Sequence, residues 1–165
     1  MRFNPILRIL RRLIMAVMTL FRLAPELVTN GDCELDDSSW VTINTPAVQE
    51  RSGVQKHGGS YSRHVVDSTP SAGGITQTVS KEAGKTYRFS FWYYIVSGTL
   101  YVGITNGNKS GALFGNFYTD TGSWQYITTN VVETITGSTG WINIQNPSGS
   151  TPAEFYVDDI SLREV

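Results

Sequence analysis

From Leu27 onward, apolar and polar residues alternate with a period of two, and short clusters of Gly, Ser, Thr and Asn interrupt the alternation. This alternation is typical of strands that pack one face on a core and expose the other. It predicts strands at Tyr61–Val66, Gly74–Val79, Lys85–Val96, Thr99–Thr105, Trp124–Val132, Gly140–Gln145 and Glu154–Arg163. Seven or eight short strands separated by turn signals predict an all-β, antiparallel jelly-roll sandwich.

The same alternation assigns side chains to the two faces of each predicted strand. In the segment KTYRFSFWYYIV, one face carries an aromatic and aliphatic series, which we expect to be core: Tyr87, Phe89, Phe91, Tyr93 and Ile95. Two later strands contribute Leu100, Val102 and Ile104, and then Ile142 and Ile144, in the same way. The opposite faces combine aromatic rings with amides, which is unusual for a surface that only meets water.

The first 25 residues follow a different pattern. Asn4-Pro5 is a typical helix start and Ala24-Pro25 a typical stop. Between them, apolar residues recur at spacings of four and three, as in helices that pack on one another: Ile6, Leu10, Leu13, Val17 and Leu20. We therefore expect an N-terminal α-helix at residues 1–26 that docks on a partner protein or forms a homo-oligomer, and a β-sandwich at residues 27–165.

Two other interpretations of this segment remain open. A signal peptide shares the basic start and the apolar run, but no small-residue cleavage site precedes the sandwich. A helix lying on a membrane surface is the other alternative. A membrane-spanning helix is not expected, because the uninterrupted run from Leu13 to Phe21 is less than half of the roughly 20 residues needed.

Charge and cysteine content argue against nucleic-acid binding, a disulfide-stabilised fold and a cysteine-rich metal site. The first 25 residues hold five arginines and no acid, whereas the rest carries eight Lys and Arg against 14 Asp and Glu, a net charge of −6. An acidic body does not predict nucleic-acid binding. Cys33 is the only cysteine, so it cannot form an intrachain disulfide or a cysteine-rich metal site. We expect it to be a small buried residue.

Five stretches together resemble carbohydrate-binding-module domains of the galactose-binding-like jelly-roll superfamily. In chain order they read LVTNGDCELDDSSW, HGGSYSRHVV, QTVSKEAGKTYRFSFWYY, SWQYITTNV and FYVDDISL. Each motif is weak alone, but the five occur in register over residues 27–165. The resemblance implies a galactose-binding-like jelly roll and two kinds of site.

The first implied site is one structural calcium ion near the first and last strands. Glu34 of NGDCE and Asp158, the first aspartate of the DD pair, match the family's side-chain ligands, with backbone carbonyls supplying the rest. Calcium favours such oxygen ligands. The alternative is that the two carboxylates only cap turns.

The second implied site is a sugar platform on the concave sheet. Sugars present apolar faces ringed by hydroxyl groups, so they favour aromatic rings flanked by hydrogen-bonding side chains. The alternative is that these rings pack against a loop or a neighbouring subunit. The candidates by strand alternation are Trp92, Tyr94, Tyr101, Trp141, Asn143 and Gln145.

No enzymatic activity is expected, since His57 and His64 are the only histidines and neither has an obvious nucleophile partner. Stand-alone domains of this type with an N-terminal anchoring segment resemble virion proteins of tailed bacteriophages. We therefore expect a structural component of a phage particle (head decoration, head fibre or tail accessory protein) that joins other virion proteins and contacts host surface glycans. The alternative is a secreted or membrane-associated carbohydrate-binding module at the cell surface.

Overall fold

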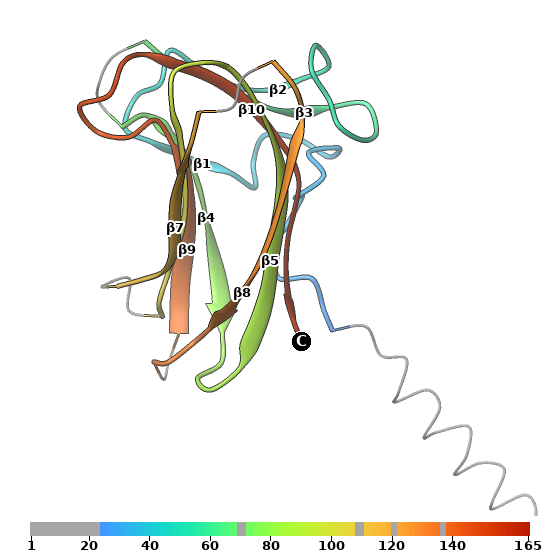
Figure 1. Ribbon diagram of the computed structural model, residues 1–165. Helices are drawn as coiled ribbons and strands as arrows, with labels where there is room; N and C mark the ends of the chain where they lie inside the picture. Colours follow the sequence, from blue (N-terminus) through green and yellow to red (C-terminus); the bar gives the residue numbers. More distant parts are fainter. Residues whose placement is uncertain (1–23, 69–71, 108–110, 120–121, 136–137) are drawn as a thin grey trace, which may run out of the picture.

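The computed structural model describes residues 24–68, 72–107, 111–119, 122–135 and 138–165. These residues form two antiparallel five-stranded sheets that pack face to face (Figure 1). The first sheet, in the order β1-β4-β9-β6-β7, consists of Val41–Ile43, Gly74–Lys81, Ser138–Gln145, Leu100–Thr105 and Ala112–Tyr118. The second sheet, in the order β2-β3-β10-β5-β8, consists of Val48–Ser52, Ser62–Asp67, Ala153–Glu164, Thr86–Ser97 and Gln125–Val132.

The predicted two-sheet sandwich is confirmed, and all seven predicted strands are present with ends within two residues of the prediction. Three strands were not predicted: β1, β2 and β7. β1 has only three residues, and β2 (VQERS) lies at a sheet edge and is largely polar. β7 (ALFGNFY) is also an edge strand, and most of its residues are exposed or half-buried. Edge strands need no strict alternation, because only part of either face contacts the core.

The predicted N-terminal helix is not part of the fold that the structure shows. The described residues contain strands and turns and no helix, and they begin at Ala24. The expected fold of a sandwich preceded by an α-helix is therefore corrected to a two-sheet sandwich. The proposed docking residues Ile6, Leu10, Leu13, Val17 and Leu20 lie outside the described residues. None of the described residues forms a helix with the length and apolar character needed to cross a membrane.

The core lies between the two sheets and follows the predicted alternation. In β5, the side chains of Tyr87, Phe89, Phe91, Tyr93 and Ile95 are at most 3% exposed. The predicted aliphatic side chains of β6 and β9 are completely buried opposite them: Leu100, Val102, Ile104, Ile142 and Ile144. The residues between these positions therefore point outward, and they form the two outer faces of the sandwich.

One end of the sandwich is closed by a buried ion pair. Lys81, the last residue of β4, extends its Nζ to within 3.3 Å of Glu133 Oε2, just beyond β8, and neither side chain is exposed. Lys81 Nζ also donates a hydrogen bond to the carbonyl of Thr105, and Glu133 Oε1 accepts one from the amide of Ile135. Burial lowers the pKa of Lys81, although Glu133 opposes that shift. Since β4 and β8 belong to different sheets, this pair joins the two layers.

Candidate functional site

The structure divides the predicted sugar platform between two opposite faces. Tyr101 lies on β6, and Trp141, Asn143 and Gln145 lie on β9, so these four share the outer face of the β1-β4-β9-β6-β7 sheet. Trp92 and Tyr94 lie on β5, which belongs to the other sheet. The six residues therefore cannot form one platform.

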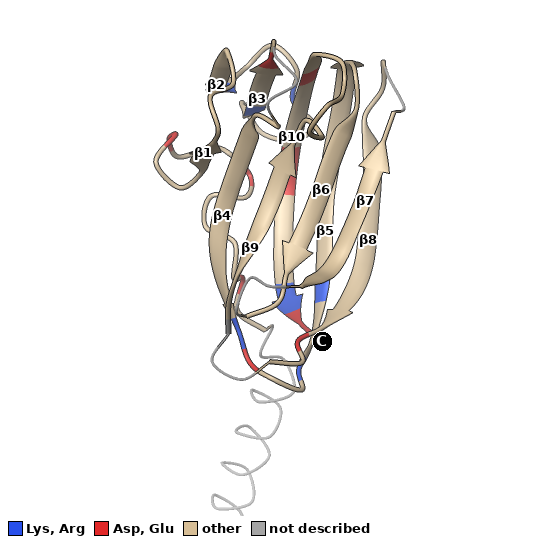
Figure 2. Ribbon diagram, turned by 90° about the vertical axis from the view of Figure 1, so that its left-hand side faces the viewer, with Lys and Arg blue, Asp and Glu red and all other residues tan. Residues whose placement is uncertain are grey.

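The sheet that carries the first four residues is almost free of charge. Its five strands contain one charged residue, Lys81, and that side chain is buried. Figure 2 shows the strands β4, β9, β6 and β7 side by side and almost entirely tan. This outer face presents rings, amides and hydroxyl groups, which suit a neutral polyhydroxylated ligand.

Tyr101 is held flat on this face by two glycines. Gly103 is its neighbour on the same face of β6, and Gly115 of β7 is the register partner of Gly103. A Cβ atom at Gly103 would lie 2.5 Å from Tyr101 Oη, and one at Gly115 would lie 2.7 Å from the same atom. The ring therefore occupies the space that side chains at these positions would fill, so one ring face is turned away from the sheet.

A shallow cavity of about 430 Å³ opens beside this ring. Phe117, the register partner of Tyr101, is 60% exposed, and its ring centroid lies 5.1 Å from that of Tyr101. The remaining lining is polar or small: Gln145, Pro147, Ser148 and Ser150. Sequence analysis found Tyr101 and Gln145 but missed Phe117 and the glycine pair, because β7 was not recognised as a strand.

The other two predicted residues of this sheet lie further along β9. Trp141 is 36% exposed and is the register partner of Thr78. Asn143 is half-buried and accepts a hydrogen bond of 2.8 Å from the Thr76 hydroxyl through Oδ1. Asn143 lies directly beside Gly103. The outer face of β9 therefore continues the surface that begins at Tyr101.

Trp92 and Tyr94 belong to a separate aromatic cluster on the opposite sheet. The imidazole of His57 stacks on Trp92 with a centroid distance of 3.6 Å, and its Nδ1 lies 2.8 Å from Asp159 Oδ2. Trp92 also contacts Tyr126 at 4.9 Å, and Tyr94 contacts Trp124 at 5.8 Å. These contacts cover part of both predicted rings, in agreement with the packing alternative.

The two predicted calcium ligands converge on the glycine loop at residues 57–61. Asp158 Oδ2 accepts hydrogen bonds from the amides of His57 and Gly58, at 2.9 and 3.1 Å. Glu34 Oε1 accepts bonds from the amides of Ser60 and Tyr61, at 2.7 and 2.9 Å. Burial raises the pKa of Asp158 to about 6, although the hydrogen bonds from the backbone amides act to lower it. Among the described residues, no group of three or more His, Cys, Asp or Glu side chains could hold a metal.

Cys33 is buried, as expected, with 2% of its surface exposed. Burial raises the pKa of its thiol to about 12, with the nearby Asp158 adding to the shift. Cys33 therefore stays protonated at neutral pH and serves as a packing residue, since the thiolate is the reactive form.

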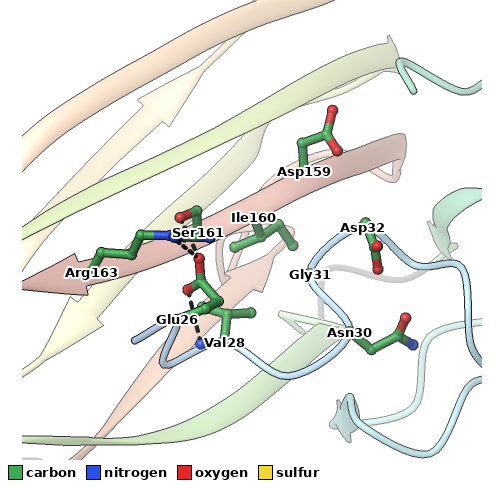
Figure 3. Close-up of a pocket in the computed structure, with 9 residues that line it drawn as sticks. All are labelled: Glu26, Val28, Asn30, Gly31, Asp32, Asp159, Ile160, Ser161 and Arg163. Carbon is green, nitrogen blue, oxygen red and sulfur yellow. Dashed lines mark hydrogen bonds and ion pairs between the residues drawn. The ribbon is translucent and has the colours of Figure 1, made fainter. Parts of the chain in front are cut away.

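A cavity of about 340 Å³ lies where the chain from Glu26 to Asp32 runs along the second half of β10. Figure 3 shows the hydrogen bonds that the Glu26 carboxylate accepts from Val28, Ser161 and Arg163 beside this cavity. The residues lining the cavity include no aromatic ring, so it does not have the composition of a sugar platform. We interpret it as a gap in the contact between the segment Glu26–Asp32 and β10, where hydrogen bonds of Glu26 hold this segment on the sandwich.

The Glu26→Gln variant tests this interpretation through pH. Burial raises the pKa of Glu26, but hydrogen bonds from Ser161, Leu162, Val28 and Arg163 outweigh it and hold the pKa below the ordinary 4.5. The carboxylate therefore stabilises the fold above about pH 4.5 and loses that effect as the pH falls through its lowered pKa. We expect E26Q to lower the melting temperature at pH 7 by about 2–4 °C, and the difference from wild type to be smaller near pH 3. An equal difference at both pH values would contradict this account.

The described residues form an antiparallel two-sheet sandwich, and one outer face carries aromatic rings and no exposed charged residue. Residues 25–152 match the family described as carbohydrate binding domain. The chain belongs to this family. No curated protein is significantly similar to it in sequence.

Solved structures agree on the fold. The chain is similar to a structure described as "CBM4 structure and function", with a TM-score of 0.66, 15% identity, and coverage of 84% of this chain and 99% of that one. It is also similar to a carbohydrate-binding module, TmCBM61, in complex with β-1,4-galactotriose, with a TM-score of 0.66, 17% identity, and coverage of 86% and 100%.

A phage protein shares the same fold. The chain is similar to part of the enzymatically active domain of bacteriophage CBA120 tailspike protein 4, with a TM-score of 0.68 and 16% identity. The match covers 85% of this chain but 21% of that one. At this identity the likeness shows the fold alone. The family match therefore favours the carbohydrate-binding module over the virion component that we expected first.

Proposed function

We propose that this protein is a non-catalytic carbohydrate-binding module that holds a neutral polysaccharide on the outer face of the β1-β4-β9-β6-β7 sheet. The observation that carries the proposal is the Tyr101 ring, which lies flat over Gly103 and Gly115. A flat ring presents one face to the ligand, and the apolar face of a pyranose stacks on such a surface. Gln145, Ser148 and Ser150 line the same cavity and supply hydrogen-bonding groups for sugar hydroxyls.

The charge and extent of this face define the ligand class. With its one charged residue buried, the sheet has no group to pair with an acidic sugar. Tyr101 and Trp141 lie on the neighbouring strands β6 and β9, but they are separated along the strand direction. Tyr101 is the register partner of Gln145, which lies four residues after Trp141 on β9. At about 3.3 Å per residue this separation is roughly 13 Å. The surface therefore suits a chain of several sugars, and the β-1,4-galactotriose held by the similar module is a suitable first ligand.

Titration with β-1,4-linked galactan fragments tests the proposal, with Tyr101→Ala as the main variant. Loss of the stacking ring should weaken binding roughly tenfold or more while the fold is retained. Tyr126→Ala is the matched control, since Tyr126 is an exposed tyrosine of the opposite sheet and should not affect binding. Equal losses in Y101A and Y126A would contradict the assignment to this face.

We also propose that Glu34 and Asp158 bind one structural calcium ion. Both carboxylates reach the 57–61 loop, and Glu34 Oε2 has no hydrogen-bonding partner among the described residues. Burial raises the pKa of Asp158, and the neighbouring Asp159 carboxylate adds to the shift. Carboxylate and carbonyl oxygens are the ligands calcium prefers. When bound, the ion would hold the loop that places His57 over Trp92.

A chelator experiment tests the calcium proposal. Adding chelator to the intact protein should lower its melting temperature, because an ion that binds only the folded state stabilises it. Glu34→Ala and Asp158→Asn should each abolish the response to chelator. Asp32→Asn is a control, because Asp32 is an exposed acid that accepts a hydrogen bond from the Glu34 amide, has no hydrogen bond with the 57–61 loop among the described residues, and does not match the family ligands. An unchanged wild-type melting curve would leave the two carboxylates as turn caps.

The location of the protein stays a prediction. A virion particle and a secreted or cell-surface module are both compatible with a glycan-binding sandwich, and the segment that would anchor it lies outside the described residues.

A further inference from the structure

The outer face of the other sheet carries an ordered strip of polar and aromatic side chains that the sugar platform does not use. It consists of three rows across neighbouring strands, set by strand register. In the first row, Trp92 of β5 is the register partner of Tyr126 of β8. In the second row, Ser90 lies between Thr128 of β8 and Ser161 of β10. In the third row, Arg88 lies between Asn130 of β8 and Arg163 of β10. The strip therefore runs from an aromatic row through a hydroxyl row to a row that carries two guanidinium groups.

The guanidinium row contains an unbalanced positive charge. Arg88 and Arg163 lie directly opposite each other on β5 and β10, an arrangement that disfavours folding because like charges face each other. Arg163 is neutralised by Glu26, with 2.9 Å between Nε and Oε2. The exposed guanidinium of Arg88 has no ion pair or hydrogen bond with any described residue. The nearby Glu164 is already paired with Lys85 at 2.5 Å.

The surface is hollowed on both sides of Arg88. A cavity of about 180 Å³ lies toward β10 and is lined by Arg88, Ser90, Ser161 and Arg163 among others. A second, of about 470 Å³, lies along β8 and is lined by Arg88, Tyr126, Thr128 and Asn130 among others. Tyr126 is 49% exposed at the end of this second hollow. A ligand in the hollows would meet a ring at one end and a free positive charge at the other.

We infer that this strip is a second glycan-binding site, specific for a sugar chain that bears a carboxylate. Arg88 binds the carboxylate in a two-pronged manner that its planar guanidinium favours. Tyr126 stacks on a sugar ring further along the chain, and Thr128, Ser90 and Asn130 hydrogen-bond to hydroxyl groups between the two. Arg88 and Trp92 are four residues apart on β5, roughly 13 Å, so the site spans more than one sugar.

Nucleic acid fits this strip less well than an acidic sugar. One unpaired guanidinium on an acidic body neutralises few phosphates, and affinity for nucleic acid depends on many such contacts. The inference goes beyond the proposed function, since it concerns a different sheet, a different set of residues and an anionic ligand instead of a neutral one.

Titration of the full chain with hexagalacturonate tests the second site. Wild type should bind hexagalacturonate at low salt, and its fully methyl-esterified form, which lacks the carboxylate charge, should bind at least tenfold more weakly. Arg88→Gln should weaken hexagalacturonate binding tenfold to a hundredfold, because a charge-assisted hydrogen-bonded pair is lost. Tyr126→Ala should weaken it to a similar degree. Lys56→Gln removes the same charge from an exposed loop position outside the strip and should bind as wild type does.

The outcomes separate this site from the neutral platform. Tyr101→Ala should leave hexagalacturonate binding intact, so failure of the neutral platform and failure of this strip give different results. The inference is overturned if wild type does not bind hexagalacturonate, or if R88Q and K56Q lose affinity equally. Arg88-dependent binding of single-stranded oligonucleotide that is tighter than hexagalacturonate binding would also overturn it, by making the strip a nucleic-acid site.

Discussion

Replacing Lys81 with methionine is expected to destabilise the sandwich by roughly 3–5 kcal/mol, the largest effect of any single substitution considered for this protein. Methionine removes the charge that faces Glu133 at 3.3 Å and leaves a completely buried carboxylate without its partner. It also removes the donor to the Thr105 carbonyl. Chemical denaturation monitored by tryptophan fluorescence gives the free energy of unfolding, because the protein has four tryptophans.

The double variant Lys81→Met/Glu133→Leu is the matched control. An apolar pair of similar volume often replaces a buried ion pair without loss, so the double variant should recover most of the stability that K81M loses. If K81M lost less than about 1 kcal/mol, the pair would behave as an exposed surface pair does and not as a buried link between the sheets.

Replacing Gly115 with alanine is expected to weaken binding of a neutral glycan about tenfold without destabilising the fold. The new Cβ atom would lie 2.7 Å from Tyr101 Oη, so the ring must lift from the sheet and lose its flat orientation. Glycine inside a strand is itself unfavourable, so alanine should leave the melting temperature unchanged or raise it. Isothermal titration and thermal unfolding of the same preparation separate the two effects.

Removing the tyrosine hydroxyl gives a rescue experiment. In the double variant Tyr101→Phe/Gly115→Ala, the atom that would collide with the new Cβ is absent, and the next ring atoms lie about 3.4 Å away. The phenyl ring should then return to the sheet, and binding should recover most of the loss. A G115A protein that binds as tightly as wild type would show that the flat ring is not what holds the sugar.

Strand alternation predicted the core because the central strands of both sheets bury one face completely. In β5, every second side chain from Tyr87 to Ile95 is buried, so the periodicity in the sequence reflects the packing directly. The same alternation could not say which sheet a strand joins. Trp92 and Trp141 both point outward, but β5 and β9 lie in different sheets, and only the long-range pairing of strands decides this.

The site depends on contacts that a single strand does not encode. Tyr101 lies flat because Gly103 and Gly115 meet across the β6–β7 register. Gly115 belongs to an edge strand that has apolar residues on both faces, so pattern analysis found no alternation there. The sequence also does not show that the guanidinium of Arg88 lacks an ion-pair partner among the described residues, because this depends on Glu26 pairing with Arg163 instead. The burial of a residue could therefore be predicted where the periodicity of its own strand determines its environment. It could not be predicted where residues on neighbouring strands determine that environment.

The most direct test of the central claim is a map of amide chemical-shift changes in the ¹⁵N-labelled protein during titration with β-1,4-galactotriose. The account predicts saturable changes at Tyr101, Gly115, Phe117 and Gln145, with the β8 residues from Tyr126 to Asn130 unaffected. Changes confined to β8 and β5, or no change at all across a panel of neutral β-1,4-linked oligosaccharides, would contradict it.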